Sequence, residues 1–378
     1  MKNKILPYGR QTIAQQDIQA VVDVLQSDWL TTGPIVGRFE QAVAQFVDTK
    51  YAVAVSNGTA ALHSIMHALD IGPGDEVIVP TMTFAATANA VVFCNGIPRF
   101  ADVDPETLLI DPDSVSRLIT PRTKALVGVD YAGQPCNYQI LRQICLDHGL
   151  ALVADACHSL GAGDGVVKCG KLADLSAFSF HPVKPITSGE GGMVVTDDAN
   201  LANSLRRFRN HGIDTDVRQR QAARGWYYEM VDLGFNYRLT DIQCALGLSQ
   251  LQRLSEWIKR RNVLAELYLK GLEHNRRIVP LSARDGVTHG YHLFVVRLKD
   301  IDRDVVFHRL REMSIGVNVH YVPVHLHPFY RERFGTKAGD CPAAEQAFKE
   351  ILSLPLFPGM QDEDVKRVLQ VLNEVVPC

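Results

Sequence analysis

Apolar positions recur at helical spacing near the start of the chain. The pattern over residues 18–25 predicts an amphipathic helix, and it follows a capping-box sequence at residues 12–15. After a short loop, apolar residues at similar spacing predict a second helix over residues 36–47. The chain is therefore expected to open with two helices, each with one buried face.

From residue 51 the pattern changes to short apolar runs separated by segments of helical length. Several runs are almost continuously apolar, which is typical of strands that helices cover on both faces of a parallel sheet. This alternation predicts an α/β fold in which ligand-binding residues gather at the carboxyl ends of the strands. The expected strands span residues 51–55, 76–79, 99–103, 125–129, 151–154, 175–180 and 192–196.

A long helical pattern over residues 241–272 is interpreted as a connector that leaves the first domain. A smaller α+β unit is expected to follow it. We divide the chain into a large domain at 1–250, which includes the N-terminal helical segment, and a small C-terminal domain at 251–378. The elements expected in the smaller unit are strands at 291–298 and 317–321 and helices at 304–313, 343–352 and 363–375.

Composition narrows the class of protein. The 378 residues are 46% hydrophobic and 21% charged, which is ordinary for a folded globular protein, and the net charge of −3 disfavours a protein organised around nucleic-acid binding. The eight cysteines form no C-x-x-C pair, so we expect reduced thiols and no metal site. No apolar leader and no run of 18 apolar residues is present, so we expect a cytoplasmic protein without a membrane span.

Three sequence features at strand ends could carry chemistry. Residues 56–59 lead from a strand into a helix, where free amides suit a phosphate, although the same residues would serve as a plain N-cap. Asp155 closes another strand, and a structural aspartate explains it equally well. Lys184 follows a third strand and could form a Schiff base, although a lone lysine is more often an ordinary surface residue.

Taken together, a phosphate cradle, a carboxylate and a lysine are the parts that a pyridoxal phosphate (PLP) enzyme needs. The lysine holds the aldehyde, and the carboxylate keeps the pyridine nitrogen protonated so that the ring withdraws electrons. Phe84, which follows the strand at 76–79, could supply an aromatic face for the ring, although alone it would be read as a core residue. The combination predicts PLP as the cofactor.

The chain resembles the DegT/DnrJ/EryC1/StrS family of PLP-dependent nucleotide-sugar aminotransferases over nearly its whole length. The resemblance implies a fold-type I aminotransferase, with a mostly parallel central sheet flanked by helices and a smaller C-terminal α+β domain. It also implies a homodimer whose active sites lie at the subunit interface. Seven motifs in the expected order carry it, at residues 56–62, 80–84, 155–161, 179–184, 190–192, 235–243 and 319–325.

The resemblance also implies roles for individual residues. Lys184 matches the Schiff-base lysine, Asp155 matches the partner of the pyridine nitrogen, and both are expected to be catalytic. The other positions that match cofactor contacts are Phe84 on the ring, His158 beside it, Gly58, Thr59 and Ser179 at the phosphate, and Asn236 at the phosphate of the other subunit.

The sequence defines the substrate-binding residues less clearly than the cofactor-binding residues. Tyr8 and Thr31 are expected substrate contacts by resemblance, and His320 and Tyr321 are read as strand-end residues near the sugar. A basic stretch could meet a diphosphate across the dimer, although a solvated loop is the slightly favoured interpretation. Its arginines are Arg218, Arg220 and Arg224.

Within the family, the chain most resembles one branch. The segments that carry this resemblance are residues 129–135, 180–187, 208–212 and 245–251. That branch transfers the amino group of L-glutamate to the C4 ketone of a UDP-linked 4-keto-6-deoxy-N-acetyl hexosamine. The product is UDP-4-amino-4,6-dideoxy-N-acetyl-β-L-altrosamine, for pseudaminic acid biosynthesis. Related branches share most of these residues, so a UDP-4-keto-pentose and a GDP- or dTDP-linked 4-keto-6-deoxyhexose stay open as alternatives.

Other classes of function fit less well. Sugar dehydratases of the superfamily have histidine in place of the Schiff-base lysine, so Lys184 favours transamination. The glycine-rich run at 161–165 does not fit the dinucleotide pattern G-x-G-x-x-G, which disfavours a nicotinamide oxidoreductase. A silent structural dimer of the same fold is disfavoured because both Lys184 and Asp155 are present.

Overall fold

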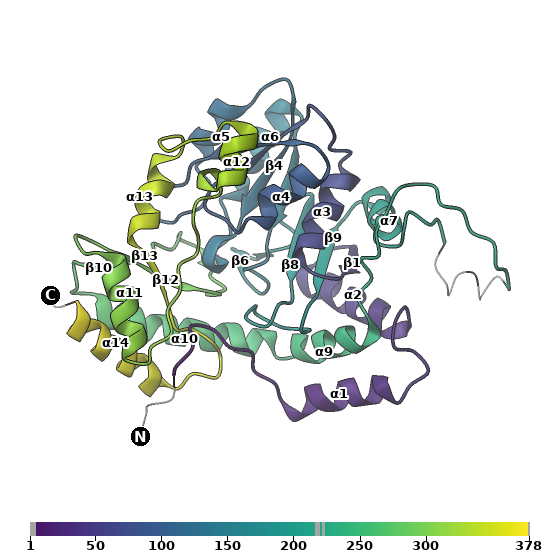
Figure 1. Ribbon diagram of the computed structural model, residues 1–378. Helices are drawn as coiled ribbons and strands as arrows, with labels where there is room; N and C mark the ends of the chain where they lie inside the picture. Colours follow the sequence, from purple (N-terminus) through teal and green to yellow (C-terminus); the bar gives the residue numbers. More distant parts are fainter. Residues whose placement is uncertain (1–4, 216–219, 221–223, 377–378) are drawn as a thin grey trace.

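A seven-stranded sheet forms the centre of the protein (Figure 1). The computed structural model describes residues 5–215, 220 and 224–376. All seven expected strands are present, and neighbours pair in parallel except for β9, which is antiparallel to both β8 and β1. Their order is β1 (Tyr51–Val55), β9 (Gly192–Thr196), β8 (Leu175–Ser179), β5 (Ala151–Asp155), β4 (Thr123–Val129), β2 (Glu76–Pro80) and β3 (Ile97–Ala101).

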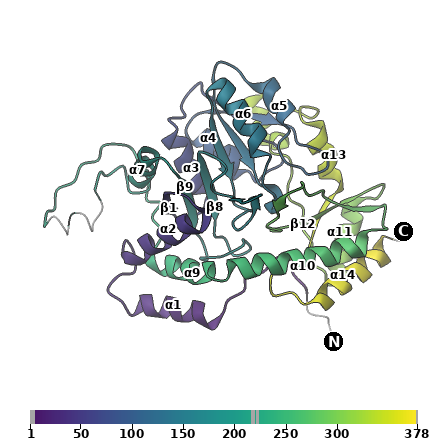
Figure 2. The same ribbon diagram turned by 180° about the vertical axis from the view of Figure 1, so that it is seen from behind.

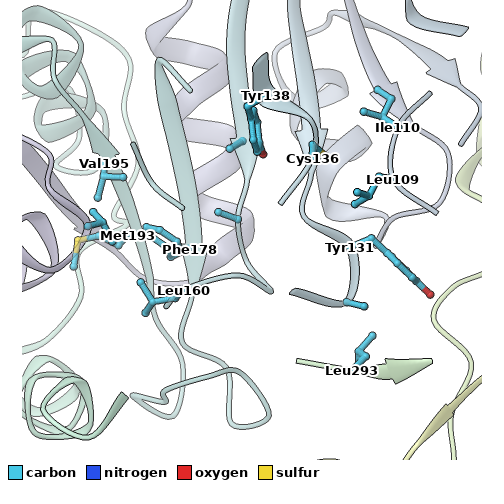
Figure 3. Close-up of a cluster of buried hydrophobic side chains, with 14 of the residues drawn as sticks. Leu109, Ile110, Tyr131, Cys136, Tyr138, Leu160, Phe178, Met193, Val195 and Leu293 are labelled. Carbon is cyan, nitrogen blue, oxygen red and sulfur yellow. The ribbon is translucent and has the colours of Figure 1, made fainter. Parts of the chain in front are cut away.

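Helices cover both faces of this sheet, which confirms the α/β prediction. Side chains of each strand alternate between the faces, so Val53 and Val55 join one apolar cluster while Ala52 and Ala54 join the other. Figure 3 shows part of the second cluster, from Tyr138 and Phe178 to Leu293 of the C-terminal half. The covering helices are α3 (Gly58–Ala68), α4 (Ala86–Phe93) and α7 (Ala199–Phe208) on the first face and α2 (Pro34–Val47) and α6 (Tyr138–His148) on the second.

The chain from α10 onward builds a smaller unit with its own apolar cluster. A three-stranded antiparallel sheet packs against helices, and α10 runs beside α14 along one side of the molecule (Figure 2). The elements are α10 (Leu254–Leu272), β10 (Ile278–Pro280), β12 (Phe294–Leu298), α11 (Arg303–Glu312), α12 (Pro328–Phe334), α13 (Pro342–Glu350), β13 (Ile351–Leu354) and α14 (Asp362–Val375). Elsewhere, α5 (Pro112–Leu118) precedes β4, and β6 (Gly163–Asp164), β7 (Val167–Lys168) and β11 (Val287–Thr288) form a third sheet.

Three expectations about these elements are wrong. The long helical pattern is two helices, because α9 (Asp241–Leu251) ends before Gln252 and α10 begins at Leu254. The segment 317–321 forms no strand and has only a single bridge, from Asn318 to Ser353. The helix expected over 343–352 ends at Glu350, since the apolar residues that follow it pair with β12 as β13.

The first helix also begins later than its capping sequence suggests. Helix α1 (Gln15–Leu25) has Ala14 as its N-cap, and the carboxylate of Asp17 accepts a hydrogen bond from the Ala14 amide at 2.9 Å. Thr12 is therefore not the cap. Instead, its carbonyl accepts a hydrogen bond from Gln250, so this segment is tied to α9.

Asp17 joins α1 to the junction between α9 and α10. This buried carboxylate accepts hydrogen bonds from Ser249 Oγ at 2.6 Å, from Gln250 Nε2 at 2.7 Å and from Arg253 at 2.6 Å. Burial opposes ionisation of Asp17, but the hydrogen bonds from Arg253, Ala14, Ser249 and Gln250 outweigh it and hold its pKa below the ordinary value.

Within the described residues, no helix has the length and apolar character needed to cross a membrane. In that same part of the chain, no group of three or more His, Cys, Asp or Glu side chains is arranged to hold a metal ion. The described cysteines are free thiols, and Cys378 lies outside the described residues.

We predict that Asp17→Ala lowers the free energy of unfolding by about 3 kcal/mol, because it leaves the Arg253 guanidinium without its carboxylate and α1 without its cap. Urea denaturation of the purified protein measures this. Asp23→Ala on the exposed side of the same helix is the control, with an expected change within about 0.5 kcal/mol. Equal effects of the two substitutions would contradict the assignment.

Candidate active site

The amino terminus of α3 meets the end of β8 at one edge of the sheet. Asn57 caps the helix by accepting a hydrogen bond from the Ala60 amide at 2.8 Å, and the first helical amides belong to Gly58 and Thr59. A Cβ on Gly58 would lie 3.0 Å from Ser179 Cβ, so a larger residue would press on the end of β8. Free amides, a helix dipole and the nearby Ser179 hydroxyl form a cradle for a phosphate.

Asp155 ends β5 beside this cradle. Its carboxylate is buried and accepts a hydrogen bond from Thr87 Oγ1 at 2.7 Å and from the Cys157 amide at 3.3 Å. Thr87 on α4 is itself hydrogen-bonded to Thr83 at 2.7 Å. Sequence analysis does not single out Thr87, since only the packing of α4 over the end of β5 brings it to this carboxylate.

Lys184 lies in the loop between β8 and β9. The loop is held at its base by the hydrogen bond from the Phe180 amide to the Gly191 carbonyl at 2.8 Å, and the Lys184 amide closes a turn on His181 at 2.9 Å. Burial lowers the pKa of Lys184 below its ordinary value, while the nearby side chains of Cys157 and Asp155 oppose this shift electrostatically. A half-buried lysine with a lowered pKa is suited to act as a nucleophile and a base.

Aromatic and imidazole rings surround the space between these groups. Phe84 is 59% exposed rather than part of the core, and its ring lies 5.8 Å from that of Tyr321. The Tyr321 hydroxyl is 3.2 Å from His158 Nε2. On the other side of Tyr321, the ring of Tyr8 lies 5.3 Å from that of His320, so the N-terminal segment closes one wall.

These groups line one cavity of about 860 Å³. All of the residues that the sequence predicts for the site contribute to its lining, except Asn236 and Thr31. Sequence analysis does not single out His292, which also lines the cavity. Its segment has no motif that predicts a ligand, and only the tertiary packing places it here.

Thr31 lies instead in a second groove, of about 590 Å³, that is rich in arginine. Asp214 is the single acidic residue among the described residues that line this groove. Asn236 is exposed outside the cavity and pairs with Asn210 beside the groove. The arginines that line the groove are Arg206, Arg207, Arg209, Arg220 and Arg238.

Arg220, one of the three arginines in the basic stretch at residues 218–224, lines this groove. Its guanidinium donates to the Thr215 carbonyl at 2.7 Å and lies 4.8 Å from the ring of Tyr228. Arg224 is exposed, and Arg218 lies outside the described residues.

Three of the histidines that line the cavity, His158, His292 and His320, are uncharged at neutral pH. Burial, reinforced by repulsion from Lys184, lowers the pKa of His320 to about 4. Burial also lowers the pKa of His158 and His292 well below the ordinary value, with added repulsion from Lys184 and from neighbouring histidines. Lys184 is the one lysine or arginine among the described residues that line the cavity.

Comparison with known proteins gives the family. The sequence profile described as "DegT/DnrJ/EryC1/StrS aminotransferase family" matches residues 11–373. The spore coat polysaccharide biosynthesis protein SpsC of Bacillus subtilis is 39% identical over 381 residues, which are 99% of this chain and 98% of SpsC.

Solved structures show the same fold. The putative sugar aminotransferase Spr1654 from Streptococcus pneumoniae in its PMP form has a TM-score of 0.93 and 29% identity, covering 98% of both chains. PseC from Helicobacter pylori, an aminotransferase involved in the biosynthesis of pseudaminic acid, has a TM-score of 0.92 and 30% identity, covering 98% of this chain and 99% of PseC. The chain therefore belongs to the DegT/DnrJ/EryC1/StrS family and is a PLP-dependent sugar aminotransferase of fold type I.

Proposed function

We propose that this enzyme transfers the amino group of L-glutamate to the C4 ketone of a UDP-linked 4-keto-6-deoxy-N-acetyl hexosamine, giving UDP-4-amino-4,6-dideoxy-N-acetyl-β-L-altrosamine and 2-oxoglutarate. The observation that carries amino transfer is the meeting of Lys184, Asp155 and the α3 amino terminus in one cavity. The choice of sugar rests on the branch-like motifs and on the likeness to PseC.

The residues of the cavity fit PLP. Gly58, Thr59 and Ser179 would hold the phosphate, because a Cβ on Gly58 would fill the cradle. His158 has a buried Nδ1 atom without a hydrogen-bond partner in this structure and lies where it would flank the ring. When bound, PLP supplies an aldehyde carbon that accepts an amino group and a pyridine ring that withdraws electrons.

Lys184 would hold the cofactor through Nζ and then act as the base of the reaction. With L-glutamate bound, the free amine of Lys184 would accept the α-proton at Nζ and would then pass it to the cofactor. Burial favours this role, since it lowers the pKa of the ammonium toward the working pH. In the second half-reaction the same nitrogen would take a proton from the aminated cofactor and deliver it to C4 of the sugar.

Asp155 would keep a proton on the pyridine nitrogen through a charge-assisted hydrogen bond. Thr87 and the Cys157 amide fix the carboxylate from the other side, so it cannot rotate away. An ionised carboxylate in this position would favour a protonated ring. Phe84 would stack on the ring, because it is exposed to the cavity and not packed in the core.

Tyr8, His320 and Tyr321 would bind the sugar. They form one wall of the cavity, and they offer hydroxyl and imidazole groups that can exchange hydrogen bonds with sugar hydroxyls. His320 Nδ1 is hydrogen-bonded to Ser353 Oγ at 2.8 Å, which fixes the orientation of its ring. The shape of this wall would select the acceptor.

The substrates carry more negative charge than one subunit can meet in the cavity. A nucleotide sugar brings a diphosphate and L-glutamate brings two carboxylates, whereas Lys184 is the single lysine or arginine among the described lining residues. The arginine-rich groove that contains Thr31 offers the missing cations. We therefore propose a homodimer in which the groove and Asn236 of one subunit complete the cavity of the other.

The segment that follows α7 supports this dimer. It projects away from the body of the molecule (Figure 1, teal) and carries large apolar side chains in water. Such a concentration of exposed apolar residues marks an interface between proteins. The residues are Trp226, Tyr227, Tyr228, Met230, Val231, Leu233 and Phe235, and Trp226 is 84% exposed.

The experiment that tests donor and acceptor follows the visible absorbance of the PLP-loaded enzyme. We predict that L-glutamate bleaches the band and that the UDP-linked 4-keto-6-deoxy-N-acetyl hexosamine restores it, with at least a tenfold higher kcat/KM than other acceptors. A UDP-4-keto-pentose and GDP- and dTDP-linked 4-keto-6-deoxyhexoses are assayed in parallel. A higher kcat/KM for one of these would overturn the proposed sugar, and a band insensitive to L-glutamate would overturn the donor.

We predict that Asp155→Asn slows both half-reactions by about 100-fold, since a neutral amide cannot hold the proton on the ring nitrogen. Stopped-flow absorbance with each substrate measures the two rates. The control is Asp174→Asn, which alters an ion pair with Arg142 beside the opposite end of β8, with rates expected within twofold of the parent enzyme. Near-normal rates in Asp155→Asn would remove the carboxylate from this role.

A third prediction concerns Thr87. Thr87→Val deletes one hydrogen bond to Asp155 without changing the size of the side chain, so the affinity for PLP is expected to fall about tenfold. Equilibrium titration of the cofactor-free enzyme with PLP measures this. Thr196→Val, which deletes a buried hydrogen bond to the Asp174 carbonyl, should leave the affinity unchanged; a similar loss there would show a general effect on the fold.

A further inference from the structure

Two buried imidazole rings lie against each other in the lining of the cavity. The centroids of His158 and His292 are 4.3 Å apart, with the rings tilted by 44°. The two residues are only 6% and 5% exposed. His158 lies beside the expected position of the cofactor ring, whereas His292 has no role in the reaction described above.

Neither ring has a full set of hydrogen bonds. The Nδ1 atoms of both His158 and His292 are buried without a partner, and the contact of His158 Nε2 is the Tyr321 hydroxyl at 3.2 Å. A protonated imidazole carries two N–H donors, and an unmet donor in a dry site is costly. The arrangement therefore favours uncharged rings.

Backbone hydrogen bonds on both sides of His292 fix its position. Hydrogen bonds join the Gly290 amide to the Gly133 carbonyl at 2.8 Å and the Leu293 amide to the Ala132 carbonyl at 3.2 Å. Gly133 has a φ of 100°, and a Cβ there would lie 2.9 Å from both the His158 carbonyl and the His292 amide. Only glycine at this turn lets the two histidine segments approach each other.

A buried cation holds the same segment from behind. Arg261 on α10 is 2% exposed and donates hydrogen bonds to the carbonyls of Tyr291 at 3.0 Å, Leu356 at 3.1 Å and His292 at 3.5 Å. No carboxylate pairs with it among the described residues. Burial lowers the pKa of Arg261 to about 10, so it stays charged at neutral pH and repels a proton from His292.

We propose that His292 is a positioning residue of the active site, whose ring fills the space behind His158, fixes the His158 ring toward the cofactor and excludes water so that His158 stays uncharged. The consequence for the cofactor rests on the proposed function. An uncharged His158 adds no positive charge beside the pyridine nitrogen, and Asp155 therefore holds the ring proton without competition.

Several groups face His158 and set its protonation. Lys184 and His320 disfavour a proton on His158, and the ring of His292 packs against the His158 ring at 4.3 Å. Tyr321 and Tyr131 are neutral, since burial raises the pKa of both hydroxyls. The negative charge of Asp155 acts in the opposite direction, and the buried Cys157 is a neutral thiol because burial raises its pKa. Access of water is therefore the factor that His292 controls.

The test is the titration of His158 in the full-length, cofactor-free enzyme. Histidines are labelled with ¹³C, the His158 signal is identified by its loss in His158→Gln, and NMR spectra are recorded from pH 5.5 to 8. Three variants are compared with the parent: His292→Ala, His292→Phe, which keeps a ring in place, and Leu293→Ala. The last is the matched control, because Leu293 is buried in the same segment and carries no imidazole ring.

We expect no titration of His158 in the parent, in His292→Phe or in Leu293→Ala. In His292→Ala we expect a midpoint that shifts toward the ordinary value of about 6.5, because water reaches the ring. Titration of His158 in the parent or in His292→Phe, or its absence in folded His292→Ala, would overturn the proposal. Titration of His158 in the parent or in His292→Phe would overturn the proposal even where His292→Ala does not fold.

A second readout uses the PLP-loaded enzyme. The pH midpoint of the visible band should shift in His292→Ala by at least half a unit and stay unchanged in His292→Phe and Leu293→Ala. A shift common to all three variants would show a general loosening of the segment and overturn the specific role. Neither readout uses a nucleotide sugar, so failure of the proposed substrate would leave this result standing.

Discussion

The order of three strands in a mostly parallel sheet is the constraint on which the site depends. Asp155 at the end of β5 pairs with Ala177 of β8, and β8 continues to Ser179, which pairs with Gly192 of β9. The carboxylate and the phosphate cradle therefore leave the same edge of the sheet two residues apart in register. Parallel strands place their carboxyl ends together, so groups distant in sequence converge without any loop having to reach far.

That convergence leaves no room for side chains at two positions. A Cβ on Gly192 would lie 2.3 Å from the Asn57 carbonyl, and a Cβ on Gly58 would press on Ser179. The amides that start α3 can reach the end of β8 because both residues are glycine. Two of the motifs that gave the family resemblance, at residues 56–62 and 190–192, thus contain positions where one element closely approaches another.

The sequence predicted most of this edge, since near-continuous apolar strands and motifs at their ends are local features. It did not predict the break between α9 and α10, because the apolar spacing continues across Gln252 while the chain turns. It also missed β13, whose apolar residues extend the preceding helical pattern and are recognisable as a strand only by pairing with β12. Thr87 and His292 were missed for the same reason: their partners, Asp155 and His158, are distant in sequence.

The smaller unit contributes uncharged polar groups around the charged residues of the cavity. Lys184 and Asp155 come from the large sheet, whereas the groups that surround them with uncharged polar surface, His292, His320 and Tyr321, come from the C-terminal half. Arg261 ties this half together through carbonyl groups alone, so its charge is not cancelled and disfavours any further cation nearby. The fold therefore separates two tasks: one half supplies the reacting lysine and carboxylate, and the other keeps their surroundings dry and neutral.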